Sequence, residues 1–490
     1  MTEIHQPTIE IEKGRLCFVE SPCVEVTMAE YKDTGVSRYY LNPFDEALPE
    51  LEKVKSNFLT LLSNYPPVPS DAYRRSGEVT RSAELAIIDS IVIPFPEFEE
   101  AAVALTLILR EAYVSRNPLT AVDRQRRHAL AAGGKDGLPF PRDWKSTAKG
   151  HGIVSISGMG KSTLVAVHNL HYPQLIYHQF AKGEQSRYRD DELRCYQLVY
   201  LVLRVPHDGT LKSLCLQFFR QIDEIFGTKY HRQAKALRNI APMADLMHQV
   251  ATAVSLGIVF IDEVQNLRSA TGNNAEIILN LFAELIEKAG ISVVVIATPA
   301  VQKVIKKNVR NARKLFSYGG TEIVPMAKGS DQLNDFFDAL WDYTFVSNKG
   351  ELTKSIRNAW YQACGGNTAF ASLAFMLSQR YEIGKREVID TASFARTLSK
   401  EMAFLQPAIS ALCSKKENRL AAFDDLLFDK RYRALRKNFG LKVSTAESDD
   451  DEFDELAEET GKDESAGSKK PPAREKKSGG DAGKRDPLAS

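Results

Sequence analysis

The sequence has few of the features that identify secreted and membrane proteins. Its six cysteines are scattered among 490 residues without CxxC spacing, which favours neither a disulfide framework nor a zinc site and fits a reducing cytoplasm. The longest apolar run, AAVALTLIL at 101–109, has nine residues and is too short to span a bilayer. The N-terminus has no basic patch followed by an apolar core, so we expect no secretory signal and no membrane partner.

Charge of one sign is also scarce, because the formal net charge is only +1. That total hides a segregation: residues 447–490 include fourteen acidic and eight basic residues, a net charge of −6, which leaves +7 on the rest. A basic body with an acidic tail is compatible with nucleic-acid contact, although the charge pattern alone is weak support. From 443 onward the sequence is rich in charge, glycine and proline and poor in aromatic residues, which predicts a disordered tail.

The stretch most typical of a function is GHGIVSISGMGKSTL at 150–164. An apolar run leads into glycines and then into a helix-compatible segment, which is the strand, loop and helix order of a phosphate-binding loop. Glycines let backbone N–H groups turn toward phosphate oxygens, and the helix beginning at Lys161 adds its positive end. Lys161 would reach the β- and γ-phosphates of ATP, and the Ser162 hydroxyl would hold Mg²⁺. The full pattern G-x4-G-K-[ST] has a glycine where this chain has Ser155, and the alternative is a chance Gly-Lys-Ser turn.

The pattern around this loop predicts an α/β fold. Apolar, β-branched runs alternate with helical segments between 150 and 326, which is typical of a parallel sheet covered on both faces. Ligands of such sheets bind at the carboxyl ends of the strands. The strands expected are 153–157, 197–205, 257–262, 291–297 and 321–325, with 174–178 as a further short strand.

The rest of the chain divides into further regions. Residues 330–412 have helical periodicity throughout and predict an all-helical second domain. In the N-terminal part, 86–95 is strand-like, an amphipathic helix then ends before Asn117, and 120–150 is typical of a linker. The alternative for this part is a helical accessory domain with no site of its own. The domains expected are an N-terminal accessory region (1–145), the core (146–328), a helical lid (329–442) and the charged tail (443–490).

A second motif, IVFIDE at 258–263, follows the phosphate loop by about a hundred residues. Four apolar residues ending in paired acids at a strand's carboxyl end are a Walker B pattern. Asp262 would hold Mg²⁺ together with Ser162, and Glu263 would polarise the attacking water. The alternative is a buried strand that runs into a polar loop. The residues expected at the nucleotide are Ser155, Ile156, Ser157, Gly158, Met159, Gly160, Lys161, Ser162, Thr163 and Asp262.

Two further features are typical of AAA+ ATPases, whose fold has this core and a helical lid. A strand ends at Thr298, where these proteins keep a first sensor that orients water or contacts the γ-phosphate. The alternative is a threonine that caps a helix starting at Pro299, which is common, and both roles can hold at once. The segment QKVIKKNVRNARK at 302–314 holds six basic residues, and Arg310 and Arg313 share a helical face at the place of an arginine finger. A solvated or DNA-facing basic surface is the alternative. GGNTAF at 365–370 occupies a second-sensor position but lacks the usual arginine, so no role is assigned.

Five stretches, four of them outside these motifs, resemble the TnsC family, the AAA+ regulators of Tns-type cut-and-paste bacterial transposons. They are YKDTGVSRYYLNPFDEALPEL, YVSRNPLT, YPQLIYH, HDGTLKSLCLQFFRQID and LGIVFIDEVQNL, in that order. The resemblance implies ATP and Mg²⁺ as cofactors, assembly into a homo-oligomeric ring or helical filament, and double-stranded DNA inside it. It also implies protein partners: a target selector like TnsD or TniQ, and transposase and endonuclease subunits like TnsB and TnsA.

The resemblance carries over to individual residues to different degrees. Lys161, Ser162, Asp262, Glu263 and Thr298 match the family's nucleotide-site positions, and Arg310 and Arg313 match its arginine-rich stretch. By approximate position only, Thr210, Lys212, Thr228 and Lys229 are the expected DNA contacts, for which an ordinary exposed helix is the alternative. Two rival functions stay open: a remodelling ATPase such as a chaperone or helicase loader, and an adaptor that binds ATP without hydrolysing it.

Overall fold

The computed structural model describes residues 9–12, 15–18, 23–62, 65–132, 139–183, 187–270, 274–305, 309–416 and 420. The charged tail expected from 443 onward lies outside these residues, as does any contact that it makes. Among the described residues no helix is both long and apolar enough to cross a membrane.

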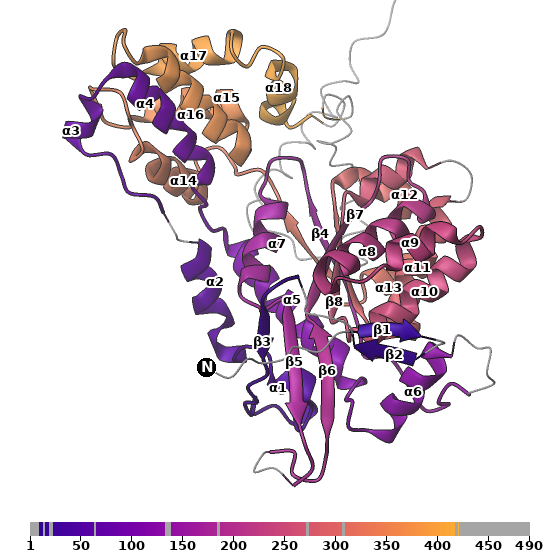
Figure 1. Cartoon of the computed structure of the whole chain (residues 1–490). Coiled ribbons are helices and arrows are strands. Elements are labelled where there is room, and N and C mark those ends of the chain that lie inside the picture. Colours follow the sequence, from indigo (N-terminus) through magenta and orange to yellow (C-terminus); the bar gives the residue numbers. More distant parts are fainter. Residues whose placement is uncertain are drawn as a thin grey trace, which may run out of the picture. The chain divides into compact units, whose positions relative to one another are not determined.

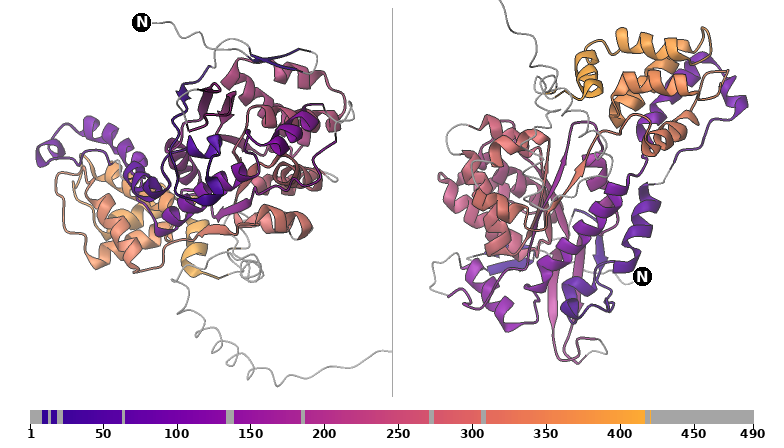
Figure 2. Two further views of the ribbon diagram at one scale, coloured as in Figure 1. Left: turned by 90° about the horizontal axis from the view of Figure 1, so that it is seen from below. Right: turned by 180° about the vertical axis from the view of Figure 1, so that it is seen from behind.

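The centre of the fold is a five-stranded sheet in the order β10-β4-β9-β8-β7, and every neighbouring pair is parallel. Helices lie on both faces, as Figures 1 and 2 show from different sides. The predicted α/β fold of a P-loop NTPase, with an N-terminal region and a C-terminal helical region, is therefore confirmed. The strands are β4 Gly150–Ser155, β7 Tyr200–Arg204, β8 Ile258–Asp262, β9 Ser292–Ala297 and β10 Gly320–Ile323.

The alternation of side chains along each strand explains why helices cover both faces of this sheet. In β8, Ile258 and Phe260 pack into one hydrophobic cluster, while Val259 and Ile261 pack into the other. Successive side chains of a strand point to opposite faces, so a strand that is apolar at every position must be buried on both. The first cluster contains α5 Pro96–Val114 and α7 Lys161–Leu170. The second contains α8 Leu211–Phe226, α10 Ile240–Ala253 and α11 Asn274–Glu284.

The strand predicted at 197–205 is wrong, because that apolar run forms two strands in two sheets. Residues Leu193–Leu198 form β6, which pairs antiparallel with β5 Leu175–Phe180, and β3 Val26–Met28 joins β5 in parallel. After the buried Val199 the chain enters the central sheet as β7. Hydrophobicity indicates that a strand is buried, but it does not indicate with which neighbouring strand it pairs. The sequence therefore does not reveal that this run passes from one sheet to the other. The short strand expected at 174–178 is β5.

Two expectations for the N-terminal part are also corrected. The strand-like piece at 86–95 contains the 3-10 helix η3 Leu85–Ser90, and the predicted linker at 120–150 contains the helix α6 Ala121–Ala131. Thr120 caps α6 by accepting a hydrogen bond from the N–H of Asp123. A threonine at this place favours a helix start, but the Arg-rich composition of the segment favoured a linker. The helix expected to end before Asn117 is α5.

The other elements are β1 Ile9–Glu12, β2 Arg15–Phe18, η1 Ser37–Tyr39, α1 Pro43–Glu46, η2 Leu51–Lys53, α2 Val54–Leu62, α9 Tyr230–Ala236, η4 Val264–Ser269, η5 Leu285–Ala289, η6 Pro299–Val301, α12 Gln302–Ile305 and α13 Val309–Leu315.

The C-terminal helices pack around one aromatic core. Trp360 is fully buried, with Phe337 stacked 4.2 Å and Phe375 4.7 Å from it between ring centres. Segments from the N-terminal third, α3 Asp71–Arg74 and α4 Glu78–Glu84, join this bundle, where Arg81 forms a two-pronged ion pair with Glu387. The lid is thus built from two distant parts of the sequence, visible as indigo helices among orange ones in Figure 1. Its helices are α14 Asp331–Trp341, α15 Lys354–Cys364, α16 Thr368–Glu382, α17 Thr391–Ser399 and α18 Gln406–Ser414.

Candidate functional site

A cavity of about 420 Å³ lies at the carboxyl ends of β4 and β8, where the fold class places its ligands. The loop after β4 enters α7 through Gly158 and Gly160, whose φ angles are +85° and +82°. Residues other than glycine rarely adopt these φ angles, so the loop needs glycine at both positions to curl over the cavity. Of the residues expected at the nucleotide, the cavity is lined by Ser157, Gly158, Gly160, Lys161, Ser162, Thr163 and Asp262.

The remaining residues of the predicted loop face the protein interior. Ile156 and Met159 are buried in the core next to α5 and α7. Ser155 is fully buried and its hydroxyl donates to the carbonyl of Ile323, 2.5 Å away on the neighbouring strand β10. A glycine at position 155 could not make this bond, so the departure from the full pattern ties the loop to the sheet. These three residues can reach a phosphate only through their backbone groups.

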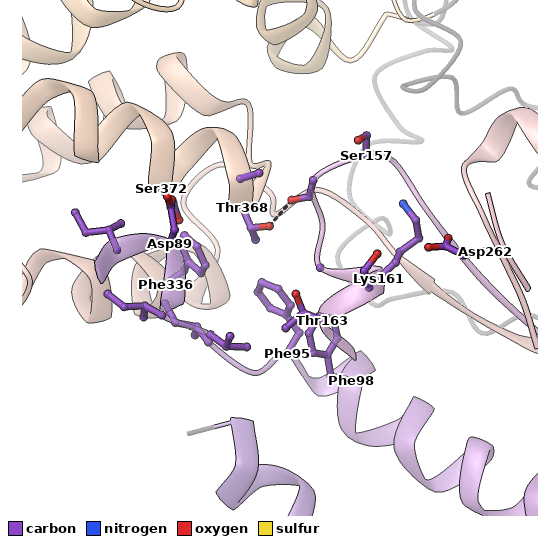
Figure 3. Close-up of a pocket in the computed structure, with 18 of the residues that line it drawn as sticks. Asp89, Phe95, Phe98, Ser157, Lys161, Thr163, Asp262, Phe336, Thr368 and Ser372 are labelled. Atoms are coloured by element: carbon purple, nitrogen blue, oxygen red, sulfur yellow. Dashed lines mark hydrogen bonds between the residues drawn. The ribbon is translucent and has the colours of Figure 1, made fainter. Parts of the chain in front are cut away.

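Lys161 has its ammonium group inside the loop. Its Nζ donates to the carbonyl oxygens of Ser155 and Ile156, both at 2.9 Å. Figure 3 shows the Lys161 side chain beside Asp262. These two hydrogen bonds hold the positive charge of Lys161 inside the loop. A bound triphosphate would compete with the two carbonyl oxygens for the ammonium group.

The paired acids follow β8 at the same edge of the sheet. Asp262 is 8% exposed and accepts the backbone N–H of Glu263, with Oδ1 to N at 2.8 Å. The guanidinium of the exposed Arg204, at the end of β7, lies 4.0 Å from the other Asp262 oxygen. Oxygen donors suit Mg²⁺, which usually takes one or two protein ligands together with phosphates and waters. Ser162 and Asp262, which line one cavity, fit that donor set, and among the described residues no group of three or more metal-binding side chains offers an alternative.

One wall of the cavity is apolar and was not expected from the sequence. It comes from the segment between η3 and α5, from the first turn of α5 and from α14, as Figure 3 shows for Phe95, Phe98 and Phe336. Phe95 stacks on Phe336 at 6.2 Å and meets Phe98 edge-on at 5.3 Å between ring centres. An apolar aromatic wall beside a phosphate loop suits a nucleotide base. The apolar run IVIPF at 91–95 is evident in the sequence, but nothing local indicates that it lines the same cavity as the phosphate loop.

A second missed contact is the lid segment GGNTAF. Asn367 Nδ2 donates to the carbonyl of Ser157 at 2.8 Å, and the Thr368 hydroxyl donates to the carbonyl of Gly158 at 2.5 Å. The N–H of Ala369 also donates to the Gly158 carbonyl, at 3.0 Å. The segment therefore lies directly on the phosphate loop although it lacks a sensor arginine. Asn367 also caps α16 by accepting the N–H of Phe370, and no role was assigned to this segment from the sequence.

Thr298 and the two arginines lie outside the cavity. Thr298 directly follows β9 and is 3% exposed, and its hydroxyl has no hydrogen-bond partner within the described part of the chain. Arg310 and Arg313 are exposed on one face of α13, whose opposite face is fixed by a bond from Asn311 to Asn280. Neither arginine makes an ion pair with a described residue. Both guanidinium groups are therefore accessible to solvent.

The four expected DNA contacts form two separate pairs. Thr210 and Lys212 lie at the start of α8, and Thr228 and Lys229 lie just beyond its end, so about 24 Å of helix separates them. The Thr210 hydroxyl caps α8 and contacts Asp208, while the Thr228 hydroxyl donates to Asp223. Only the two lysines are fully exposed. The threonine hydroxyls therefore have local structural partners, whereas the ammonium groups face solvent.

One family model matches the part of the chain that carries the phosphate loop and most of the central sheet. Residues 147–305 match the AAA domain family. No curated protein matches the chain. Among solved structures, the Walker-type ATPase of Pyrococcus abyssi is similar at 13% identity and a TM-score of 0.32, over 59% of this chain and 83% of that one.

Proposed function

We propose that this protein is an ATP-hydrolysing regulator of DNA transposition that assembles on target DNA and connects a target-selection protein to the transposase. The observation that carries the ATPase part is the cavity that collects Lys161, Ser162, Asp262 and Glu263 beside an apolar wall. The transposition part rests on the resemblance of five stretches to the TnsC family, two of which lie outside residues 147–305.

The proposed chemistry follows from the groups at the cavity. The loop N–H groups and Lys161 bind the β- and γ-phosphates, and the aromatic wall takes the base. Ser162 and Asp262 hold Mg²⁺, which supplies charge neutralisation at the phosphates. A water forms the new bond to the γ-phosphorus and gives its proton to Glu263. The bond from the γ-phosphorus to the bridging oxygen breaks, and ADP leaves with that electron pair.

We propose that the nucleotide also joins two subunits. One subunit contributes the cavity, and the exposed face of α13 on its neighbour contributes Arg310 or Arg313 to the γ-phosphate. A guanidinium suits this task because it is planar and always charged. Loss of the γ-phosphate then loosens the joint and disassembles the oligomer, so that hydrolysis acts as a timer.

DNA contact is best assigned to the lysines of the two pairs at the ends of α8. Lys212 and Lys229 are exposed, while the carboxylates of Asp208 and Asp223 stand beside the threonine hydroxyls and would repel a phosphate there. Phosphate contacts carry no sequence information, so we expect binding without base preference.

The test measures ATP turnover and oligomer size with and without duplex DNA. Glu263→Gln should still bind ATP, lose turnover by about 100-fold or more, and accumulate ATP-bound oligomers on DNA. Stimulation by a protein substrate without any need for DNA would favour a remodelling ATPase. Binding without turnover would favour the adaptor. A protein that stays monomeric and ignores duplex DNA with a slowly hydrolysed ATP analogue would refute the proposal.

A further inference from the structure

The chain directly after the paired acids adopts an unusual conformation. Glu263 has a φ of +59°, the left-handed region that costs a non-glycine residue about 1–2 kcal/mol. Three hydrogen bonds compensate: Glu263 N–H to Asp262 Oδ1 at 2.8 Å, Asn266 N–H to the Glu263 carbonyl at 2.9 Å, and Asn266 Nδ2 to the Val205 carbonyl at 3.0 Å. A turn held in this way starts the 3-10 helix η4 and places Gln265 next to Glu263.

The side-chain amide of Gln265 links the ends of two strands. Its Nε2 donates to Oε2 of Glu263 at 2.6 Å, and its Oε1 accepts the backbone N–H of Thr298 at 3.2 Å. The reversed amide would set an oxygen against the carboxylate and an NH₂ group against an N–H, so only this orientation is compatible with both neighbours. One amide therefore contacts the Glu263 carboxylate and the end of β9 at the same time.

We propose that Gln265 is a positioning residue for ATP hydrolysis, which fixes the Glu263 carboxylate for water activation and couples it to Thr298. This inference rests on the proposed function, in which Glu263 accepts the proton of the attacking water. The amide holds Oε2 and leaves Oε1 to accept that proton. Because Thr298 is joined through its backbone, a shift of β9's end on phosphate binding would move the amide and the carboxylate together.

The size of the effect follows from the geometry that proton transfer needs. A general base must lie within hydrogen-bonding reach of its proton, and a displacement of about 1 Å costs on the order of 100-fold in rate. Glu263 is only partly buried, so without the amide its carboxylate has solvent-facing rotamers available. We expect nucleotide binding to be independent of the Gln265 amide, since Gln265 does not line the cavity.

The test compares kcat and KM for ATP in four variants of the full chain. Gln265→Met keeps the length of the side chain without either hydrogen bond and should lower kcat about 10- to 100-fold, with KM and ATP affinity within about twofold of wild type. Gln265→Glu sets two carboxylates together and should lower kcat at least as much. Gln221→Met is the matched control, because the Gln221 amide makes one hydrogen bond, to the Val202 carbonyl, and its loss should leave kcat unchanged.

The exchanged double variant, Glu263→Gln with Gln265→Glu, separates positioning from folding. The amide at position 263 can then donate to the carboxylate at position 265, whose other oxygen still accepts the backbone N–H of Thr298. The thermal stability of this variant should therefore return to the wild-type value, while turnover stays lost. Wild-type kcat in Gln265→Met would overturn the inference, as would a fall in ATP affinity and stability that fully accounts for its lower rate. Undiminished turnover in Glu263→Gln would instead refute the proposed function, because Glu263 would then not be the base.

Discussion

Replacing Arg81 by methionine tests whether residues 71–90 fold as part of the C-terminal helical bundle. Arg81 is 3% exposed and its two terminal nitrogens lie 2.7 and 2.8 Å from the carboxylate oxygens of Glu387. Glu387 also accepts the N–H groups of Ser347 and Gly384. Removal of one partner leaves a mostly buried charge without its main counter-charge, which costs about 3–5 kcal/mol. Total stabilities of folded domains are about 5–15 kcal/mol, so Arg81→Met should unfold the lid at a much lower urea concentration.

The pH dependence of this loss has a definite sign. Hydrogen bonds from Arg81, followed by those from Ser347 and Gly384, lower the pKa of Glu387 from 4.5 to about 2. Because the folded pKa lies below the unfolded one, the carboxylate stabilises the fold above pH 4.5 and loses that contribution as the pH falls toward 2. The difference between wild type and Arg81→Met should therefore be constant from pH 7 to 5 and shrink below pH 4.5.

Tryptophan fluorescence during urea unfolding is a suitable assay, because two of the three tryptophans, Trp341 and Trp360, belong to the lid. Lys349→Met is a matched control, since Lys349 pairs in the same lid with Asp342, whose side chain is 60% exposed. Such surface pairs contribute about 0–1 kcal/mol. If Arg81→Met unfolded at the same urea concentration as this control, the docking of residues 71–90 on the lid helices would be wrong.

Two further predictions concern the phosphate loop and a buried histidine. Gly160→Ala puts a methyl group 2.9 Å from Phe98 at a positive φ, so ATP affinity should fall by about 10-fold or more in a titration with a fluorescent analogue. Gly183→Ala, with a similar φ and open space, should leave that affinity unchanged. Burial lowers the pKa of His178 to about 4, so the wild type should lose stability as the pH falls from 6.5 to 4, by up to about 3 kcal/mol. His178→Gln should flatten that part of a pH series of melting temperatures, and an unchanged slope would contradict a neutral buried imidazole.

The sequence by itself was sufficient for features that depend on neighbouring residues. Gly158-Met159-Gly160-Lys161-Ser162 encodes a turn and a helix start within a few residues, and IVFIDE encodes a buried strand with acids at its end. The alternating fold class follows from the order of such segments. Roles that are local in the chain, such as a backbone that must curl around phosphates, leave a local pattern, and this is why both motifs can be located from the order of the amino acids alone.

Tertiary structure alone decided which distant segments meet at the site. Phe98 and Asn367 lie on opposite sides of the phosphate loop in sequence, yet both contact the cavity or the loop itself. Gln265 reaches Thr298, 33 residues away, and the apolar run at 197–205 divides between two sheets. Hydrophobicity and propensity report whether a residue is buried and in which kind of element. The partner that buries it depends on how whole layers pack, and that is a property of all the chain's contacts together.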